Sequence, residues 1–209
     1  MSKIMYLDIE TLPAGEASHP ALKYLFEKIS KKKSKKVDGD ENGGFDKFVL
    51  KTSFDGSYGR ILCIGYAMDT EPVQCLYDTD EKVLLKKFWD IASLCDLFVG
   101  HNVMDFDLRF IYQRSMVLGI KPTKDLNFAR YRNSPIFDTM KEWVKWNYGD
   151  NVSLEHIALA MGFPTPKEGI DGSQVYKFFQ EGKVAEVCDY CKRDVETTRN
   201  VHRRMIFLE

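Results

Sequence analysis

Acidic side chains occur in three short segments that are far apart in the sequence. Asp8 and Glu10 close an apolar run near the start of the chain, Asp107 comes after a second apolar run, and Asp194 stands in a helical pattern near the end. Unit charges about 4 Å apart repel by roughly 4 kcal/mol at an effective dielectric constant near 20. Divalent cations would remove that penalty. The pattern therefore favours a fold that brings the three segments together around metal ions.

The order and spacing of these acids are more specific than each motif alone, because Asp-x-Glu and Phe-Asp are both frequent by chance. The second segment reads Asn-x-x-x-Phe-Asp and ends at Asp107, and the third has Tyr190 four residues before Asp194. With these motifs the chain resembles the DEDD superfamily of 3′-5′ exonucleases, most closely the exonuclease domains of family B DNA polymerases and their predicted freestanding relatives. The histidine branch has His five residues before the last Asp, where this chain has Asp189. The resemblance is therefore to the tyrosine (DEDDy) branch.

This resemblance implies hydrolysis with two metal ions. Asp8 would bridge both ions, Glu10 and Asp194 would complete the site that activates water, and Asp107 would act at the second ion, directly or through a water. Mg²⁺ is the expected cofactor because it prefers carboxylate, phosphate and water oxygens, and Mn²⁺ is the alternative. Tyr190 is expected to orient the water, since an unperturbed phenol has a pKa of about 10 and is rarely deprotonated at neutral pH. These five residues are the predicted catalytic residues, and the four acids are the predicted metal ligands.

The resemblance also predicts the substrate. The expected reaction releases nucleoside 5′-monophosphates from the 3′ end of single-stranded DNA. DNA is favoured over RNA because the second motif and the loop at residues 167–175 resemble the polymerase type. The predicted substrate-binding residues are Thr11, Leu12, Asn102 and Phe106. An exoribonuclease of the same superfamily and a nucleic-acid-binding module that has lost catalysis are alternatives that stay open.

Two further acids and a C-x-x-C motif have simpler interpretations. Asp105 competes with Asp107 for the second motif, but the spacing selects Asp107 and leaves Asp105 as a surface acid. Asp138 stands at a predicted strand-to-helix junction and is interpreted as the N-cap of the helix. Cys188 and Cys191 form a C-x-x-C motif, yet a zinc site would need two more ligands at partner spacing, and none is evident. Packing of small thiols is favoured there over metal or redox function.

The apolar periodicity predicts an α/β fold. Strands are expected at residues 4–9, 60–68, 73–77, 97–100 and 135–137, and helices at residues 81–92, 107–118, 138–148, 153–161, 173–180 and 184–207. Five strands with helices between and after them fit the ribonuclease H-like fold that the resemblance implies, a mixed five-stranded sheet flanked by helices. On the last helix, Tyr190 and Asp194 stand at i and i+4 and so share one face.

Length and composition fit one domain. A chain of 209 residues with 44% hydrophobic content can bury a sizeable core. We predict a single exonuclease domain over residues 1–209, with a variable insertion at residues 13–58 that matches no motif. The insertion contains a lysine-rich loop at residues 28–36, either a basic arm that binds phosphates or a solvated loop without a role. No polymerase domain is expected in addition, so a polymerase acting in trans is the partner considered.

The apolar stretches and the cysteines of the sequence bear on the cellular location of the protein. No apolar stretch reaches the roughly 18 residues that a membrane span needs, and no apolar region with a cleavage site follows the first residues. Five cysteines, an odd number, do not make a secreted disulfide framework. We therefore predict a cytoplasmic protein with no membrane partner. The formal charge of −1 says little about nucleic acid, because four clustered carboxylates would offset surrounding Lys and Arg in the sum.

Overall fold

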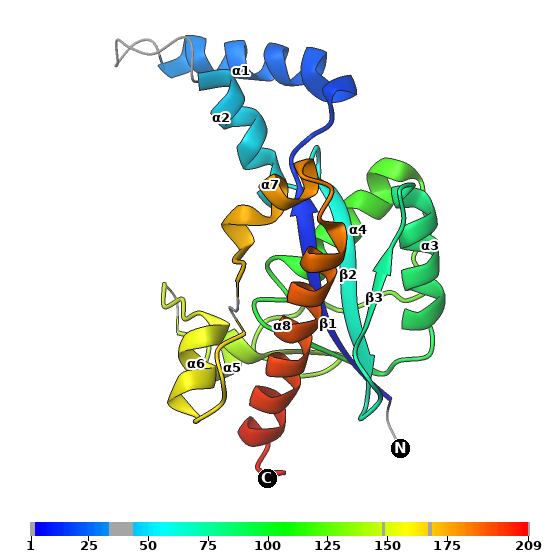
Figure 1. The fold of residues 1–209 in the computed structure, drawn as a ribbon, viewed down its shortest axis with the longest axis vertical. Helices are drawn as coiled ribbons and strands as arrows, with labels where there is room; N and C mark the ends of the chain where they lie inside the picture. Colours follow the sequence, from blue (N-terminus) through cyan, green and yellow to red (C-terminus); the bar gives the residue numbers. More distant parts are fainter. Residues whose placement is uncertain (1–2, 34–43, 148, 167–168, 209) are drawn as a thin grey trace.

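A mixed sheet of five strands forms the centre of the molecule (Figure 1). The computed structural model describes residues 3–33, 44–147, 149–166 and 169–208. The strands are β1 (Ile4–Leu12), β2 (Arg60–Met68), β3 (Gln74–Tyr77), β4 (Leu97–Gly100) and β5 (Ile136–Asp138), in the order β3-β2-β1-β4-β5. β1 to β3 pair antiparallel, whereas β1 with β4 and β4 with β5 pair parallel. The predicted mixed five-stranded sheet is therefore confirmed.

Helices cover both faces of this sheet. The α-helices are α1 (His19–Lys33), α2 (Gly44–Leu50), α3 (Glu81–Ala92), α4 (Asp107–Leu118), α5 (Thr139–Trp143), α6 (Leu154–Ala160), α7 (Val175–Gln180) and α8 (Val184–Met205). Short 3-10 turns are η1 (Glu16–Ser18), η2 (Lys51–Phe54) and η3 (Gly172–Gln174). Within the described part of the chain, no helix is long and apolar enough to cross a membrane.

The side chains of β1 alternate between the two covered faces. Met5 and Leu7 belong to the large core cluster that includes residues of α3 and α4. Tyr6 packs on the opposite face, in a cluster that includes a valine of α8. Because successive strand residues point to opposite faces, Asp8 and Glu10 belong to the face that α8 covers. α8 lies across β1 and β2 on that face (Figure 1).

α3 and α4 are joined by polar contacts as well as by apolar packing. Trp89 Nε1 donates to Ser115 Oγ at 2.9 Å, and Arg114 forms an ion pair with Glu81 at 2.8 Å. Arg114 also donates to the backbone carbonyl of Gly56. α4 ends before Gly119, whose φ of 70° is the left-handed conformation that favours glycine after a helix. The predicted bounds of α3 and α4 are confirmed.

The described part of residues 13–58, which match no motif, contains the α-helices α1 and α2. α1 and α2 pack through Phe26, whose ring centroid lies 5.8 Å from that of Phe45 and 5.5 Å from that of Phe48. The pair lies beyond one end of the sheet (Figure 1). The lysine-rich stretch expected as a loop is helical up to Lys33, because lysine is a good helix former. Residues 34–36, which complete that stretch, lie outside the described residues.

The helix predicted at residues 138–148 is shorter in the structure. α5 ends at Trp143, and Lys145 and Trp146 have φ values of 49° and 61°. Left-handed residues of this kind end a helix, but they are usually Gly or Asn. The sequence gives no such signal here, so the prediction was too long.

Candidate active site

Two carboxylates of β1 lie beneath α8. Asp8 is opposite Gly65 of β2 in the sheet register. A Cβ atom at Gly65 would lie 2.8 Å from Sγ of Cys191 on α8, so the missing side chain lets the helix approach the sheet closely. Cys191 Sγ lies 3.4 Å from Asp8 Oδ2. The ligand atoms of Asp8, Glu10 and Cys191 all lie within 4.8 Å of one another.

Asp107 reaches the same strand from the other side. β1 pairs with β4 only from Ile4 to Tyr6, so the rest of β1 has no strand partner on that side. Asp107, the first residue of α4, fills this gap, and its Oδ1 accepts a hydrogen bond from the backbone N–H of Ile9 at 3.0 Å. Only 2% of Asp107 is exposed. The second acidic segment is therefore fixed to the first through the backbone.

The charges at this place repel one another. Burial raises the pKa of Asp8 well above its ordinary value, and the nearby carboxylates of Asp107, Asp194 and Glu10 raise it further. Burial, followed by Asp194 and Asp107, also raises the pKa of Glu10. Burial raises the pKa of Asp107 to about 7. Four carboxyl groups in this arrangement ionise together only with cations beside them, and their oxygens are the ligands that Mg²⁺ prefers. The residues present therefore fit a divalent metal centre.

Tyr190 faces these carboxyl groups from α8. It is hydrogen-bonded to Asp194, one turn further along the helix. Burial, followed by the charges of Asp194 and Glu10, raises the pKa of Tyr190 above its ordinary value. The phenol is therefore protonated at neutral pH, which suits a hydrogen-bonding group and not a general base.

A pocket of about 700 Å³ opens beside Glu10. Thr11 lines it, and the hydroxyl of Thr11 donates to the backbone carbonyl of Ser53 at 2.7 Å. Phe106 and Phe54 line it as well, with ring centroids 6.4 Å apart. Further lining residues include Lys51, Tyr176 and Lys177. The pocket thus combines aromatic rings with two lysines next to the acidic cluster.

The sequence did not predict four of these pocket residues. Lys51 and Phe54 lie in the insertion that matches no motif, and Tyr176 and Lys177 lie on α7. Phe54 is 72% exposed, an unusual state for a phenylalanine, but exposure is visible only once the fold is known. No motif or spacing in the sequence distinguishes these residues from ordinary loop and helix residues.

Two predicted substrate-binding residues do not line this pocket. Leu12 is 3% exposed and packs in a core cluster with Val187 and Tyr190, which speaks against a contact with substrate. Leu12 is buried because β1 continues to Leu12, whereas the sequence predicted a strand that ends at residue 9. Asn102 has a φ of 58° in the turn after β4, and its backbone N–H donates to Asp138 at 3.0 Å. A substrate contact by the Asn102 side chain stays a prediction.

The neighbouring acids have the structural roles that the sequence indicates. Asp138 is the N-cap of α5 and accepts hydrogen bonds from the backbone N–H groups of Met140 and Lys141. It is 1% exposed and also accepts hydrogen bonds from the backbone N–H groups of Asn102 and Met104 in the turn after β4. Asp105 pairs with Lys141 at 2.6 Å, and half of its side chain is exposed. Both interpretations are confirmed.

Comparisons with known proteins agree with this geometry. The family described as "Predicted 3'-5' exonuclease related to the exonuclease domain of PolB" matches residues 67–209. That range contains Asp107, Tyr190 and Asp194, whereas Asp8 and Glu10 precede it. No curated protein matches the chain.

A family B DNA polymerase from the hyperthermophilic archaeon Pyrobaculum calidifontis is similar in structure. The match covers 99% of this chain, with a TM-score of 0.67 and 13% sequence identity. This chain spans 25% of the length of that polymerase chain. At this identity the likeness shows the fold, and it confirms the predicted ribonuclease H-like fold.

Proposed function

Because the chain belongs to the family of predicted 3′-5′ exonucleases related to the exonuclease domain of PolB, we propose that it removes nucleoside 5′-monophosphates from the 3′ end of single-stranded DNA. The observation that carries this proposal is the meeting of four carboxyl groups with Tyr190 at one buried place. These groups come from β1, α4 and α8, which lie far apart in the sequence. Such a concentration of charge costs stability and is best explained by chemistry that needs metal ions.

Each residue of this place has a distinct task in the proposal. Asp8, Glu10, Asp107 and Asp194 would hold two divalent cations, Mg²⁺ or Mn²⁺. Bound there, the cations lower the pKa of a water molecule and offset the charge that develops at the phosphate. The hydroxyl of Tyr190 donates to Asp194, and its oxygen accepts a hydrogen bond from the attacking water. This orients the water for attack in line with the leaving 3′ oxygen of the preceding nucleotide.

The pocket beside Glu10 would bind the terminal nucleotide. Phe54, Phe106 and Tyr176 offer aromatic faces, and stacking of a base on an aromatic ring does not depend on base identity. Lys51 and Lys177 supply positive charge for the phosphates. We favour DNA because the second motif resembles the polymerase type, and a polymerase acting in trans stays a prediction.

The test is digestion of 5′-labelled single-stranded DNA and RNA of identical sequence with Mg²⁺, Mn²⁺ or EDTA. We expect a ladder of products shortened from the 3′ end on DNA, and no ladder with EDTA or with the Asp8→Ala variant. The Asp105→Ala variant is the matched control, because Asp105 is an exposed acid near the site. This control should keep full activity.

Three outcomes would contradict the proposal. A ladder of products mainly from RNA would indicate that the enzyme acts in RNA processing. Shortening from the 5′ end would contradict the polarity. Folded wild-type protein that binds both strands but cleaves neither would indicate a binding module without catalysis.

A further inference from the structure

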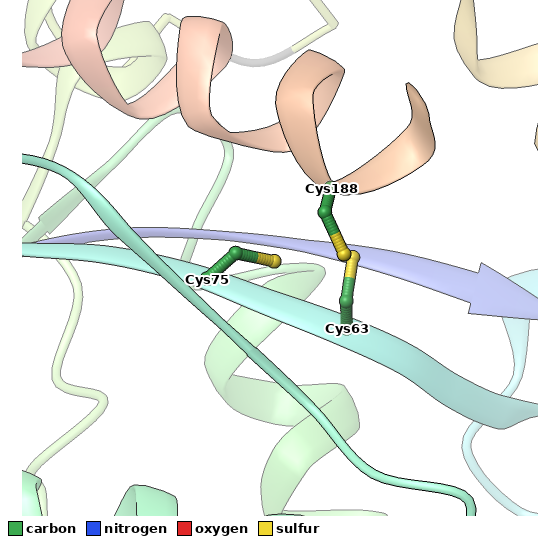
Figure 2. Close-up of side chains that lie close together, drawn as sticks. All are labelled: Cys63, Cys75 and Cys188. Atoms are coloured by element: carbon green, nitrogen blue, oxygen red, sulfur yellow. The ribbon is translucent and has the colours of Figure 1, made fainter. Parts of the chain in front are cut away.

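Three cysteines gather beside the carboxylate cluster. Cys63 comes from β2, Cys75 from β3 and Cys188 from α8, and Figure 2 shows their side chains pointing toward one another. Their three sulfur atoms all lie within 4.8 Å of one another. We call Cys63, Cys75 and Cys188 the thiol cluster.

The sheet register explains why these residues meet. Cys75 pairs with Gly65 on the neighbouring strand, and Cys63 lies two residues before Gly65. Cys63 and Cys75 therefore share one face of the sheet, the face covered by α8. Gly65 lets α8 approach the sheet closely, and Cys188 of α8 therefore lies against the thiols of Cys63 and Cys75. The two cysteines that meet Cys188 of the C-x-x-C motif are thus strand residues, brought to it by tertiary structure and not by spacing in the sequence.

We propose that the thiol cluster binds Zn²⁺ through three thiolates. A tetrahedral zinc site with Zn–S bonds of about 2.3 Å places its sulfurs about 3.8 Å apart, so the cluster needs only small movements to close around an ion. The fourth position falls to Cys191, whose thiol interacts with those of Cys63 and Cys75, or to a water molecule. Each thiol that becomes a ligand loses its proton to solvent as Zn²⁺ binds.

The surroundings of the cluster favour an ion over simple packing of thiols. Cys75 and Cys188 are only partly buried, so an ion can reach them. Lys192, four residues after Cys188 on α8, brings a positive charge near both thiols. Soft thiolates prefer Zn²⁺, whereas the neighbouring carboxylates prefer Mg²⁺ or Mn²⁺. The two places therefore select different metals although they are adjacent.

A zinc ion here would fix the catalytic part of α8. Tyr190 lies between Cys188 and Cys191 in the sequence. A zinc ion bound to Cys188 of α8, Cys63 of β2 and Cys75 of β3 would therefore hold that turn of the helix against the sheet. Zinc would then have a structural role. This inference does not depend on the proposed exonuclease activity.

The test is metal content and Co²⁺ spectroscopy on untagged protein prepared under reducing conditions. We expect about one zinc per chain by mass spectrometry of the metal, and an intense thiolate-to-cobalt charge-transfer band after replacement with Co²⁺. Co²⁺ bound by the carboxylates gives only weak absorption, so the two sites are distinguishable. Cys75→Ala and Cys188→Ala should lower zinc affinity by more than about 100-fold, because even changes outside the ligand set cost about 10–100-fold.

The matched control is Cys95→Ala, since Cys95 is a buried cysteine remote from the cluster, in contact with Met68. It should keep its zinc and its cobalt band. Folding of each variant is checked by circular dichroism, and removal of zinc should lower the melting temperature of the wild type but not of folded Cys75→Ala. Wild-type protein without zinc or a cobalt band would overturn the proposal. A disulfide within the cluster of protein isolated without zinc would overturn it in favour of a redox pair.

Discussion

The ring and the hydroxyl of Tyr190 have separable roles. The ring packs in a core cluster, whereas the hydroxyl faces the carboxyl groups and bonds to Asp194. Tyr190→Phe keeps the ring and removes only the oxygen that would orient the water. We expect kcat on single-stranded DNA to fall about 10–100-fold, within the range usual for a lost positioning interaction, with KM nearly unchanged.

Steady-state rates with Mg²⁺ measure this effect. Tyr24→Phe, which alters an exposed tyrosine on α1, is the control and should behave as the wild type. A Tyr190→Phe enzyme with full kcat would show that the hydroxyl has no part in the reaction, even if the carboxylates do.

At the scale of the element, the contact between α8 and the sheet depends on Gly65. An added Cβ would lie 2.8 Å from Cys191 Sγ and 3.0 Å from a methyl group of Val195. Gly65→Ala should therefore push α8 outward and cost about 1–3 kcal/mol of unfolding free energy, as overpacking usually does. Activity should fall as well, because α8 carries Tyr190 and Asp194.

Urea denaturation and the DNA assay together test this expectation. Gly15→Ala is the matched control, because a Cβ there would meet only Arg60 atoms at ordinary contact distances of 3.8 Å or more. Unchanged stability and activity in Gly65→Ala would show that α8 does not need this close approach.

The ion pair between α3 and α4 is the second prediction at this scale. The side chains of Arg114 and Glu81 are 7% and 14% exposed. Glu81→Ala would leave the Arg114 guanidinium buried without its carboxylate, at a cost of about 3–5 kcal/mol. Lys87→Ala breaks the more exposed pair with Asp78 and should cost at most about 1 kcal/mol. Denaturation midpoints that show equal losses for the two variants would contradict this.

The elements themselves were largely predictable from the sequence. α3 has clear apolar periodicity and begins after the N-cap Asp80, and α4 ends before the stop signal Gly119, so these bounds follow from local chemistry. The end of α5 was not predictable, because Lys145 and Trp146 adopt a left-handed conformation that their residue types do not announce. Tertiary contacts decide the conformation there.

At the scale of the whole molecule, β1, β5 and α8 meet around a buried histidine. His202 is hydrogen-bonded to Tyr6 at 3.0 Å and packs against Phe137. Burial, followed by the charge of Arg203, lowers the pKa of His202 to about 4. In the unfolded chain the pKa is about 6.5, so between these values the unfolded state binds more protons. The stability that the neutral His202 contributes is therefore full above about pH 6.5 and should fall by about 2–3 kcal/mol as the pH decreases toward 4.

Urea titrations of the wild type and of His202→Gln between pH 7 and pH 4 measure this loss as the difference between the two proteins, because the carboxyl groups with raised pKa values change stability in the opposite direction. The loss that comes from His101, whose pKa burial also lowers to about 4, should remain in His202→Gln. His156→Gln is the control, since His156 is exposed on α6. An unchanged pH dependence in His202→Gln would assign the effect to other groups.

The site as a whole divides into parts that sequence can and cannot predict. Asp8, Glu10, Asp107, Tyr190 and Asp194 were found because their types and spacing form motifs, and the structure brings them together. Four residues of the pocket beside Glu10 and the two strand cysteines beside Cys188 were not found. They depend on sheet register and on how α2, α7 and α8 pack, which local patterns do not encode.

The position of β1 in the middle of the sheet also affects how the chain can fold during synthesis. β1 is made before the other strands, yet its neighbours β2 and β4 begin only at residues 60 and 97, and α8 begins at residue 184. At about 5–20 residues per second, β1 waits several seconds on the ribosome for its first neighbour. We expect chaperones to bind the apolar segment of β1 during this time. The carboxylates and Tyr190 cannot meet until α8 has been made, so the proposed metal centre stays incomplete in the nascent chain until then.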